Sequence, residues 1–191
     1  MPTLAEAPLA SARVRLRPWR NADRAPFAAM NADPRVMAFF PSCLTSAESD
    51  ALADRIAAHF ERHGFGLWAL ELPGVAPFAG CVGLALPGFV ARFTPCVEIG
   101  WRLAFDHWGR GYATEAARLA LARAFGPLGL REVVSFTTVG NRRSRAVMER
   151  LGMRHDVAED FDHPSLADGH PLRRHVLYRL AAEGFKSMQY N

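Results

Sequence analysis

The sequence has few cysteines, almost no lysine and no long apolar run. The three cysteines, Cys43, Cys81 and Cys96, show no CxxC spacing, which argues against a disulfide framework and favours a reducing compartment. No run of eighteen apolar residues occurs, so no membrane span is expected. Because the first residues also lack the basic start and apolar stretch of a signal peptide, we expect a cytoplasmic protein.

The charge of the chain is basic and comes almost wholly from arginine. The formal net charge is +4 over 191 residues, and Lys186 is the single lysine. One tight basic cluster, "NRRSR", occupies residues 141–145, whereas the other arginines are scattered as on solvated faces. This distribution argues against nucleic acid as the main partner.

Length and composition predict one globular domain. With 50% apolar residues, a chain of 191 residues can bury a substantial core. We expect a flexible N-terminal segment over residues 1–12, a domain over 13–181 and a C-terminal tail over 182–191.

The first half of the domain predicts a strand, helices and a hairpin. "RVRLRPW" (13–19) alternates as a half-exposed strand does, and short helices follow up to Pro41. Thr45 and Glu48 form a capping box for a helix that ends at Gly64. The strand patterns "FGLWALEL" and "FAGCVGLAL", separated by "PGVAP", predict a hairpin.

The second half predicts a crossover and a closing strand pair. The strands "CVEIGWRLAF" (96–105) and "REVVSFTTV" (131–139) flank a helix that runs to about Phe125. A short helix over 141–152 and the strands "MRHDVAED" and "RRHVLYRL" follow. A strand–helix–strand passage requires a parallel crossover. The expected class is therefore α+β, with one mixed, mostly antiparallel sheet flanked by helices in the order β-α-α-βββ-α-β-α-ββ.

The stretch "WGRGYATEAA" (108–117) joins a predicted strand to a predicted helix. Glycines at such a junction often form only a turn. They also permit positive φ and let a ligand approach the bare amides of the first helical turn, which bind phosphate. The stretch has no GKS or GKT and does not match GxGxxG, so it is neither a nucleotide P-loop nor a dinucleotide fingerprint.

Four stretches in register resemble the GNAT superfamily of N-acetyltransferases. "WGRGYATEA" resembles its acyl-CoA pyrophosphate loop, with Trp108 at the Gln/Arg place, Gly111 at the glycine and Ala113 at the final small residue. "RVRLRPWRNAD" resembles the opening strand and helix, and "NRRSRAVMERLGM" the Asn-x-x-Ser helix. "HPLRRHVLYRL" is similar to the closing strand of the RimJ/RimL branch, named for acetylation of ribosomal-protein N-termini.

The resemblance implies a cofactor site for acetyl-CoA as co-substrate. The strand before the loop would hold the pantetheine arm through the backbone of Trp101 and Leu103. Asn141 would bond the pantetheine, although a plain N-cap is an equal alternative. Arg143, together with Arg142 and Arg145, would contact the 3′-phosphate of CoA. The alternative is that these arginines form a solvated basic turn. The expected pyrophosphate loop comprises Trp108, Gly109, Arg110, Gly111, Tyr112, Ala113 and Thr114.

The resemblance and the residue chemistry give two catalytic candidates. The resemblance to the RimJ/RimL branch implies Ser144 as the acid that protonates the departing thiolate, and a solvated helix serine is the alternative. Met148 stands where many relatives carry a tyrosine as the acid, so either Ser144 supplies the proton or the thiolate leaves unassisted. Glu98 is the candidate general base, since burial in an apolar strand raises a carboxyl pKa. An ion pair of Glu98 with Arg102 is its structural alternative, and Glu71 is a second candidate base.

The acceptor site is the least defined part of the sequence. Phe39 and Phe40 fall where the family's first helices border the acceptor, although both could be core residues. Asp160 lies in an acidic stretch that would attract an amine or would simply be a solvated loop. The histidine spacings match no common zinc pattern, so no metal is expected.

The expected function is N-acetyltransfer from acetyl-CoA to a primary amine, a small molecule or a protein N-terminus, by direct attack in a ternary complex. The alternative is a module that binds or senses acyl-CoA, or mediates an interaction, without turnover. The sequence leaves open the acceptor and the oligomeric state, a homodimer included.

Overall fold

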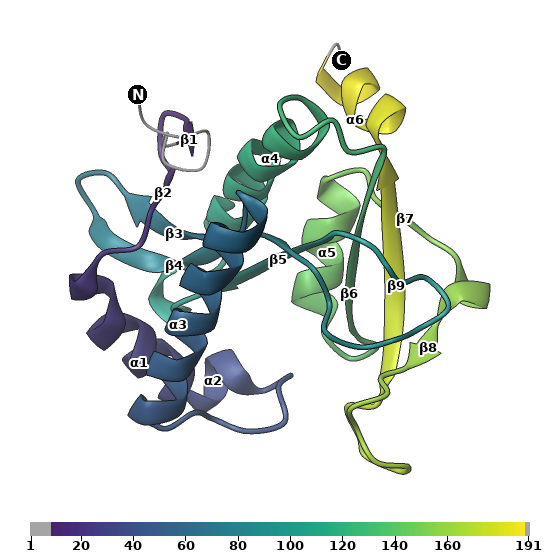
Figure 1. Ribbon diagram of the computed structural model, residues 1–191, viewed down its shortest axis with the longest axis horizontal. Coiled ribbons are helices and arrows are strands. Elements are labelled where there is room, and N and C mark those ends of the chain that lie inside the picture. The colour runs from purple at the N-terminus through teal and green to yellow at the C-terminus, as the bar shows by residue number, and fades with distance from the viewer. Residues whose placement is uncertain (1–8, 190–191) are drawn as a thin grey trace. The chain divides into compact units, whose positions relative to one another are not determined.

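The computed structural model describes residues 9–189, which form two compact units (Figure 1). The first unit contains residues 9–85 and 100–120, and the second contains 86–99 and 121–189. The chain passes from one unit to the other within strand β5 (Glu98–Leu103) and within helix α4 (Tyr112–Phe125).

The first unit contains an antiparallel series of four strands. β1 (Leu9–Ala10) pairs with β2 (Arg15–Arg17), which pairs with β3 (Leu67–Leu72), which pairs with β4 (Ala76–Ala85). The predicted hairpin at "PGVAP" is thereby confirmed. Within the segment expected to be flexible, Leu9 and Ala10 form β1, while residues 1–8 lie outside the described part of the chain.

The helices of the first unit follow the predicted caps. They are the short 3-10 helix η1 (Asn21–Asp23), α1 (Arg24–Ala32), α2 (Pro34–Met37) and α3 (Ser46–His63). The Thr45 side chain accepts a hydrogen bond from the Glu48 amide, and the Glu48 carboxylate accepts one from the Thr45 amide, at 2.8 Å. Gly64 ends α3 at a φ of 71°, a left-handed conformation that glycine adopts without steric cost.

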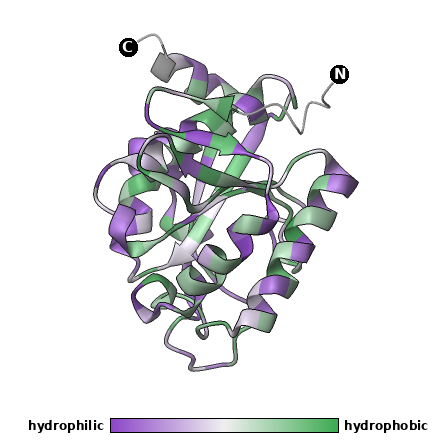
Figure 2. Cartoon of the chain, turned by 90° about the vertical axis from the view of Figure 1, so that its left-hand side faces the viewer, coloured by the Kyte–Doolittle hydropathy of each residue, from purple (hydrophilic) through white to green (hydrophobic). Residues whose placement is uncertain are grey.

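The core of the first unit lies between its helices and strands. Figure 2 shows that the helices are banded in hydrophilic and hydrophobic residues, which is typical of elements with one buried face. Phe27 of α1 and Phe78 of β4 both pack against the Trp19 ring. The buried members of this cluster are Phe27, Met30, Val36, Met37, Ala53, Ile56, Ala69, Phe78 and Cys81.

The part of β5 in the first unit packs very closely on β4. The Ala104 amide donates a hydrogen bond to the Ala79 carbonyl at 2.9 Å. Gly80 has a φ of 146°, and a Cβ added there would lie 2.2 Å from the Arg102 carbonyl oxygen. This approach is open only to glycine, and it sets the position of the strand that carries Trp101 and Leu103. The short helix η2 (Phe105–His107) then leads toward α4.

The second unit is built around two long antiparallel strands. β6 (Glu132–Thr138) pairs with β9 (Arg174–Ala181), and the short strands β7 (Arg154–His155) and β8 (Phe161–Asp162) also pair with β9. At the start of β5, Glu98 lies opposite Val134 in a parallel pair. The predicted parallel crossover is therefore confirmed.

Helices and aromatic residues complete the second unit. The helices are α5 (Arg142–Arg150), η3 (Val157–Glu159) and α6 (Ala182–Gln189). The core joins Phe93, Val134, Phe161 and Leu177 to the partly buried Phe89 and Phe136. Within the expected C-terminal tail, residues 182–189 form α6, in which Phe185 packs against Phe125.

The predicted α+β class, mixed and mostly antiparallel with flanking helices, is confirmed. The prediction of a long strand over 153–160 is wrong, because only Arg154–His155 pair before η3 begins. Among the described residues, no helix has the length and apolar character needed to cross a membrane.

Replacement of Gly80 by alanine is expected to destabilise the fold strongly. The new Cβ would collide with the Arg102 carbonyl, which is backbone and cannot rotate away. We expect the free energy of unfolding, measured by urea titration, to fall by about 2–5 kcal/mol. Gly88→Ala is the control, because a Cβ there meets nothing within 4 Å. Equal stability of the two variants would contradict the close β4–β5 contact.

Candidate functional site

The loop that enters α4 has the backbone conformation expected of an anion-binding turn. Gly109 and Gly111 have φ values of 75° and 81°, and both are exposed. The Glu115 amide donates to the Gly111 carbonyl at 3.1 Å. This is the first bond of the helix, so the preceding amides of Tyr112, Ala113 and Thr114 have no intrahelical acceptor. They lie at the positive end of the helix dipole, where an anion is stabilised.

Glycine is required in this loop by conformation rather than by crowding. A Cβ on Gly109 would meet nothing within 4 Å, and one on Gly111 would lie 3.6 Å from Nη2 of Arg13. The space above both residues is therefore open to a ligand that needs close access to the backbone. The structure thus fits a phosphate-bearing substrate at Gly109–Thr114 in conformation, exposure and donor chemistry.

Arg13 and Glu115 support this loop, and no pattern in the sequence pointed to either of them. The two side chains form an ion pair, in which Nε of Arg13 donates to Glu115 at 2.8 Å. Ser11 donates to the same carboxylate at 2.6 Å, and Nη1 of Arg13 donates to the Arg110 carbonyl at 3.3 Å. The Arg13 guanidinium also lies 5.4 Å from the centre of the Tyr112 ring. The segment before β2 thereby holds the first turn of α4 in place.

Trp108 fastens the end of β5 to the same loop. Its indole N–H donates to the Leu103 carbonyl at 2.8 Å, and the centre of its ring lies 5.1 Å from the centre of the Phe105 ring. Leu103 is buried, whereas Trp101 is partly exposed. The Trp108 indole is thus engaged within the protein, which favours a structural role for this side chain beside the loop.

Glu98, at the start of β5, carries an unusual carboxyl group. Although part of its surface stays accessible, burial raises the pKa of Glu98 to about 8. No hydrogen bond or neighbouring charge among the described residues contributes to this shift. The suggested ion partner Arg102 bonds instead to Asn31. The carboxyl group is therefore set to exchange a proton near neutral pH.

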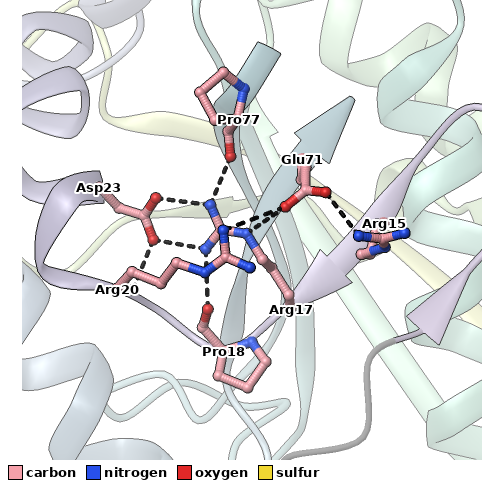
Figure 3. A network of polar contacts seen from close by, with 7 residues as sticks. All are labelled: Arg15, Arg17, Pro18, Arg20, Asp23, Glu71 and Pro77. Atoms are coloured by element: carbon pink, nitrogen blue, oxygen red, sulfur yellow. Dashed lines mark hydrogen bonds and ion pairs between the residues drawn. The ribbon is translucent and has the colours of Figure 1, made fainter. Parts of the chain in front are cut away.

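Glu71, the second candidate base, is committed to a network of arginines (Figure 3). Its carboxylate contacts Arg15 at 2.9 Å, Arg17 at 2.8 Å and Arg20 at 3.7 Å. Arg17 also forms a double hydrogen bond with the buried Asp23, at 2.7 Å for each bond. A carboxylate that already contacts three guanidinium groups is engaged as a structural partner, so Glu71 is a poor general base.

The two phenylalanines predicted at the acceptor site lie just after α2. Phe39 and Phe40 are 37% and 36% exposed, so neither is a core residue. The Arg102 guanidinium lies 4.1 Å from the centre of the Phe40 ring. Phe40 was a candidate from its place in the sequence, whereas its cationic neighbour Arg102 was not expected there.

At the start of α5, the N-cap reading of Asn141 is confirmed. Its side-chain oxygen accepts from the Ser144 amide at 3.2 Å, and its nitrogen donates to Thr137 at 2.9 Å. Ser144 is partly buried, and Met148 is fully buried. A role of Asn141 in binding pantetheine stays a prediction.

The arginines of α5 differ in their surroundings. Arg143 is exposed, whereas Arg145 donates to the Val139 carbonyl at 3.2 Å and to the Tyr178 hydroxyl at 3.4 Å. These bonds hold Arg145 within the second unit, and a phosphate contact of Arg143 stays a prediction.

The side chains of the acidic stretch that contains Asp160 are paired with basic residues. Asp160 is mostly buried and lies 2.7 Å from Nε2 of His155. This arrangement weighs against the predicted attraction of an amine by the stretch. The pairs are Glu159 with Arg179, Asp160 with His155, Asp162 with Arg173 and Arg174, and Asp168 with Arg173. Within residues 9–189, no group of three or more histidine, cysteine, aspartate or glutamate side chains could hold a metal ion.

The predicted site residues fall in both units. The first unit brings Leu103 and Trp108 into contact and carries the loop from Gly109 to Thr114, and it also holds Phe40. The second unit brings Asn141 and Ser144 into contact and also holds Glu98.

Comparison with known proteins agrees with this geometry. The family model described as "Acetyltransferase (GNAT) domain" matches residues 13–154. The chain is 30% identical over 150 residues to "Uncharacterized protein YkkB" of Bacillus subtilis, a match that covers 78% of this chain and 86% of YkkB. Over 62 residues it is 45% identical to "FsC-acetyl coenzyme A-N(2)-transacetylase" of Aspergillus fumigatus, which covers 32% of this chain and 26% of that protein.

A solved structure extends the similarity to nearly the whole chain. The crystal structure of the acetyltransferase from Agrobacterium tumefaciens str. C58 is 28% identical and superposes with a TM-score of 0.72. The match covers 91% of this chain and 94% of that one.

The raised pKa of Glu98 predicts a pH-dependent stability. The folded protein holds this proton up to about pH 8, whereas the unfolded chain loses it near the ordinary pKa of 4.5. The associated stability is complete below pH 4.5 and is lost as the pH rises to about 8. The free energy of unfolding is expected to fall by up to about 1.4 kcal/mol per pH unit in this window.

Urea unfolding of wild type and Glu98→Gln across the same pH range measures this effect. The variant is expected to lose the Glu98 part of the slope, because glutamine does not titrate. Glu61→Gln, at an exposed position of α3, is the control and should keep the wild-type slope. Parallel curves for wild type and Glu98→Gln would show that Glu98 titrates normally.

Proposed function

Because this chain belongs to the acetyltransferase (GNAT) family, we propose that it transfers the acetyl group of acetyl-CoA to a primary amine by direct attack in a ternary complex. The family membership makes the chain an acyltransferase with acetyl-CoA as co-substrate. The amine as acceptor, the direct attack and the residues that perform it are our proposal. The observation that supports this mechanism most directly is the raised pKa of Glu98, which suits a general base.

In this proposal the entrance of α4 binds the pyrophosphate of acetyl-CoA. The support is the positive φ of Gly109 and Gly111 together with the amides that the helix leaves without acceptors. Arg13 prearranges the loop through its bond to the Arg110 carbonyl. The side chain of Arg13 is 56% exposed, so it adds positive charge on the solvent side of the loop.

The pantetheine arm is assigned to the backbone of β5. Trp101 and Leu103 are its proposed contacts, and the fixed position of this strand against Gly80 supports a rigid binding edge. Asn141 and Arg143 are proposed as further contacts, to the pantetheine and to the 3′-phosphate respectively. An amide of the same strand would polarise the thioester carbonyl.

The reaction needs one proton acceptor and one proton donor. The amine must lose a proton before its nitrogen attacks the thioester carbon, and Glu98 is the proposed acceptor of that proton. A base with a pKa of about 8 is partly ionised at neutral pH and is strong enough to take a proton from an ammonium group. The new C–N bond forms as the C–S bond breaks, and the sulfur departs as the CoA thiolate. The nitrogen releases its second proton as the amide forms, and this proton replaces the one that the thiolate takes up.

Ser144 is the proposed donor to the departing thiolate. Met148 has no acidic proton and is fully buried, so it cannot supply one. The Ser144 hydroxyl is partly exposed in the first turn of α5, where the Asn141 cap fixes its backbone. No covalent acetyl-enzyme is required, since the amine itself is the nucleophile.

The resemblance of the closing strand to the RimJ/RimL branch leaves a protein N-terminus among the acceptors, beside small amines. A cytoplasmic location and a homodimer stay predictions. A module that binds acyl-CoA without turnover is the alternative function, and the absence of a titratable side chain at Met148 is its support.

Gly111→Val is expected to weaken acetyl-CoA binding at least about tenfold, measured by calorimetry. A β-branched residue resists the φ of 81°, so the loop would change conformation and displace its amides. Gly74→Val is the matched control, because Gly74 has a φ of 73° in the β3–β4 turn and lies outside the proposed site. Equal losses in both variants, or none in Gly111→Val, would contradict the proposed cradle.

Glu98→Gln is expected to lower kcat/KM for the amine by about 100- to 10,000-fold, the usual contribution of a general base. In wild type the rate should rise as the pH approaches about 8 and then level off, because the active form is deprotonated. Initial rates are measured with two acceptors of different amine pKa, so that titration of an enzyme group can be distinguished from titration of the acceptor amine. If the pH–rate profiles of both acceptors have an inflection near pH 8 that Glu98→Gln loses, Glu98 is supported as the general base. An inflection that shifts with the pKa of the acceptor contradicts this role.

A further inference from the structure

Two arginines of the first unit are set among packed side chains, and they differ in how their charge is balanced. Arg17 is 3% exposed and is matched by Asp23 and Glu71, which give it two carboxylates. Arg102 of β5 has no carboxylate partner among the described residues. A buried cation without an anion is costly, so the exception requires an explanation.

The immediate neighbours of Arg102 are neutral. Its Nη1 donates to Oδ1 of Asn31 at 2.6 Å, and its guanidinium lies 4.1 Å from the centre of the Phe40 ring. The neighbouring Cys81 thiol is uncharged, because burial raises its pKa to about 11. Burial in turn lowers the pKa of Arg102 from its ordinary value, although an arginine stays charged at neutral pH. The positive charge is therefore partly desolvated and uncompensated.

The orientation of the guanidinium is fixed from behind. Asn31 is fully buried, and its Nδ2 donates to the buried Ser49 hydroxyl at 2.9 Å. This bond turns Oδ1 of Asn31 toward Arg102, so one corner of the guanidinium is held in a single direction. Phe40 supports the flat face of the group. A planar cation fixed in this way retains N–H groups for a second partner.

That second partner can reach Arg102 from solvent. Arg102 is only partly buried by surface area, and Phe40 is 36% exposed. Phe40 is also one of the two residues expected to border the acceptor. Arg102 itself stands between Trp101 and Leu103, the proposed backbone contacts of the cofactor.

We infer that Arg102 binds a carboxylate carried by the acceptor, so that the substrate class is an amine that also bears a carboxylate group. This inference deepens the proposed function and rests on it. The carboxylate would accept hydrogen bonds from the free N–H groups of Arg102 while the apolar part of the acceptor packs on Phe40. Asn31 and Ser49 act as positioning residues, because they orient Arg102 without touching the acceptor.

A carboxylate fits this site better than the other anions at hand. The phosphates of acetyl-CoA already have a proposed place at the entrance of α4. One guanidinium with a neutral amide and a ring matches a single negative charge, whereas a phosphate dianion calls for a second cation. A planar carboxylate also matches the fork of an arginine in geometry.

The test compares acceptors that differ only in the carboxylate. The common L-α-amino acids, β-alanine and 4-aminobutyrate are assayed against their carboxamides, and 2-aminoethylphosphonate serves as the phosphate-like arm. Wild type is expected to prefer the best acid over its amide by about 10- to 100-fold in kcat/KM, the range expected for a charge-assisted hydrogen bond. Equal use of acid and amide, or a preference for the phosphonate, overturns the inference.

Arg102→Gln is the diagnostic variant, since a glutamine amide still donates to Asn31 and preserves the packing. Its acid-to-amide ratio should fall close to one while its rate with the amides stays near that of wild type. Arg24→Gln is the control, because Arg24 is a solvent-exposed arginine on α1 that pairs with Asp50 and Asp54. It should keep the wild-type ratio. An equal loss for acids and amides in Arg102→Gln would show a structural role only.

A binding readout separates this inference from the proposed function. The acids at saturating concentration should raise the Tm of wild type but not that of Arg102→Gln, and the amides should raise neither. If the acids stabilise the protein without being acetylated, the proposed function fails and the carboxylate site stands. If the amides are acetylated as fast as the acids, the function stands and the inference fails. If acids produce neither a Tm shift nor a product, the inference fails.

Discussion

The close contact between Gly80 and the backbone of β5 determines the position of the β5 residues that the proposed site uses. The Arg102 carbonyl oxygen lies 2.2 Å from the place that a Cβ of residue 80 would occupy, so β5 can lie this close to β4 only while residue 80 is glycine. Trp101, Arg102 and Leu103 are carried by this strand, and the Trp108 indole then ties the strand end to the loop before α4. A backbone edge, a cation and an anion-binding turn are thereby ordered by one packing constraint. Rigid support of this kind is what a binding site requires.

The chain treats its buried charges in three different ways, and the differences point to function. Arg17 receives two carboxylates and is structural. Glu98 receives no partner and keeps its proton up to about pH 8. Arg102 keeps its charge beside a neutral amide and an aromatic ring. The first arrangement stabilises the fold, whereas the other two cost stability and are best explained by a proton to be moved and an anion to be bound.

Local patterns in the sequence predicted most of the fold. The Thr45–Glu48 box, the Gly64 stop and the hairpin at "PGVAP" depend on neighbouring residues, and each is confirmed. The strand expected over 153–160 is wrong, and local patterns predicted neither β1 nor α6, because pairing or packing with distant segments decides the outcome at all three places. Periodicity carries no information about such contacts.

The same distinction applies to the site. The glycine loop could be proposed from the sequence because its residues are contiguous, and Glu98 because a lone carboxylate in an apolar strand is conspicuous. The contacts of Arg13 with Glu115 and of Arg102 with Asn31 join residues 102 and 71 positions apart. No spacing rule connects them. Glu71 was a reasonable candidate in sequence, and only the fold reveals its three arginine partners.

Direct acetyl transfer from acetyl-CoA to an amine is the central claim, and a single-turnover experiment analysed by mass spectrometry tests it most directly. Enzyme in excess over acetyl-CoA is mixed with a pool of amines, and both the small molecules and the intact protein are weighed over time. The account predicts one N-acetyl product and one CoA per acetyl-CoA consumed, with the protein mass unchanged throughout. An acetylated protein that appears before the product, or acetyl-CoA that stays bound and intact, would contradict it.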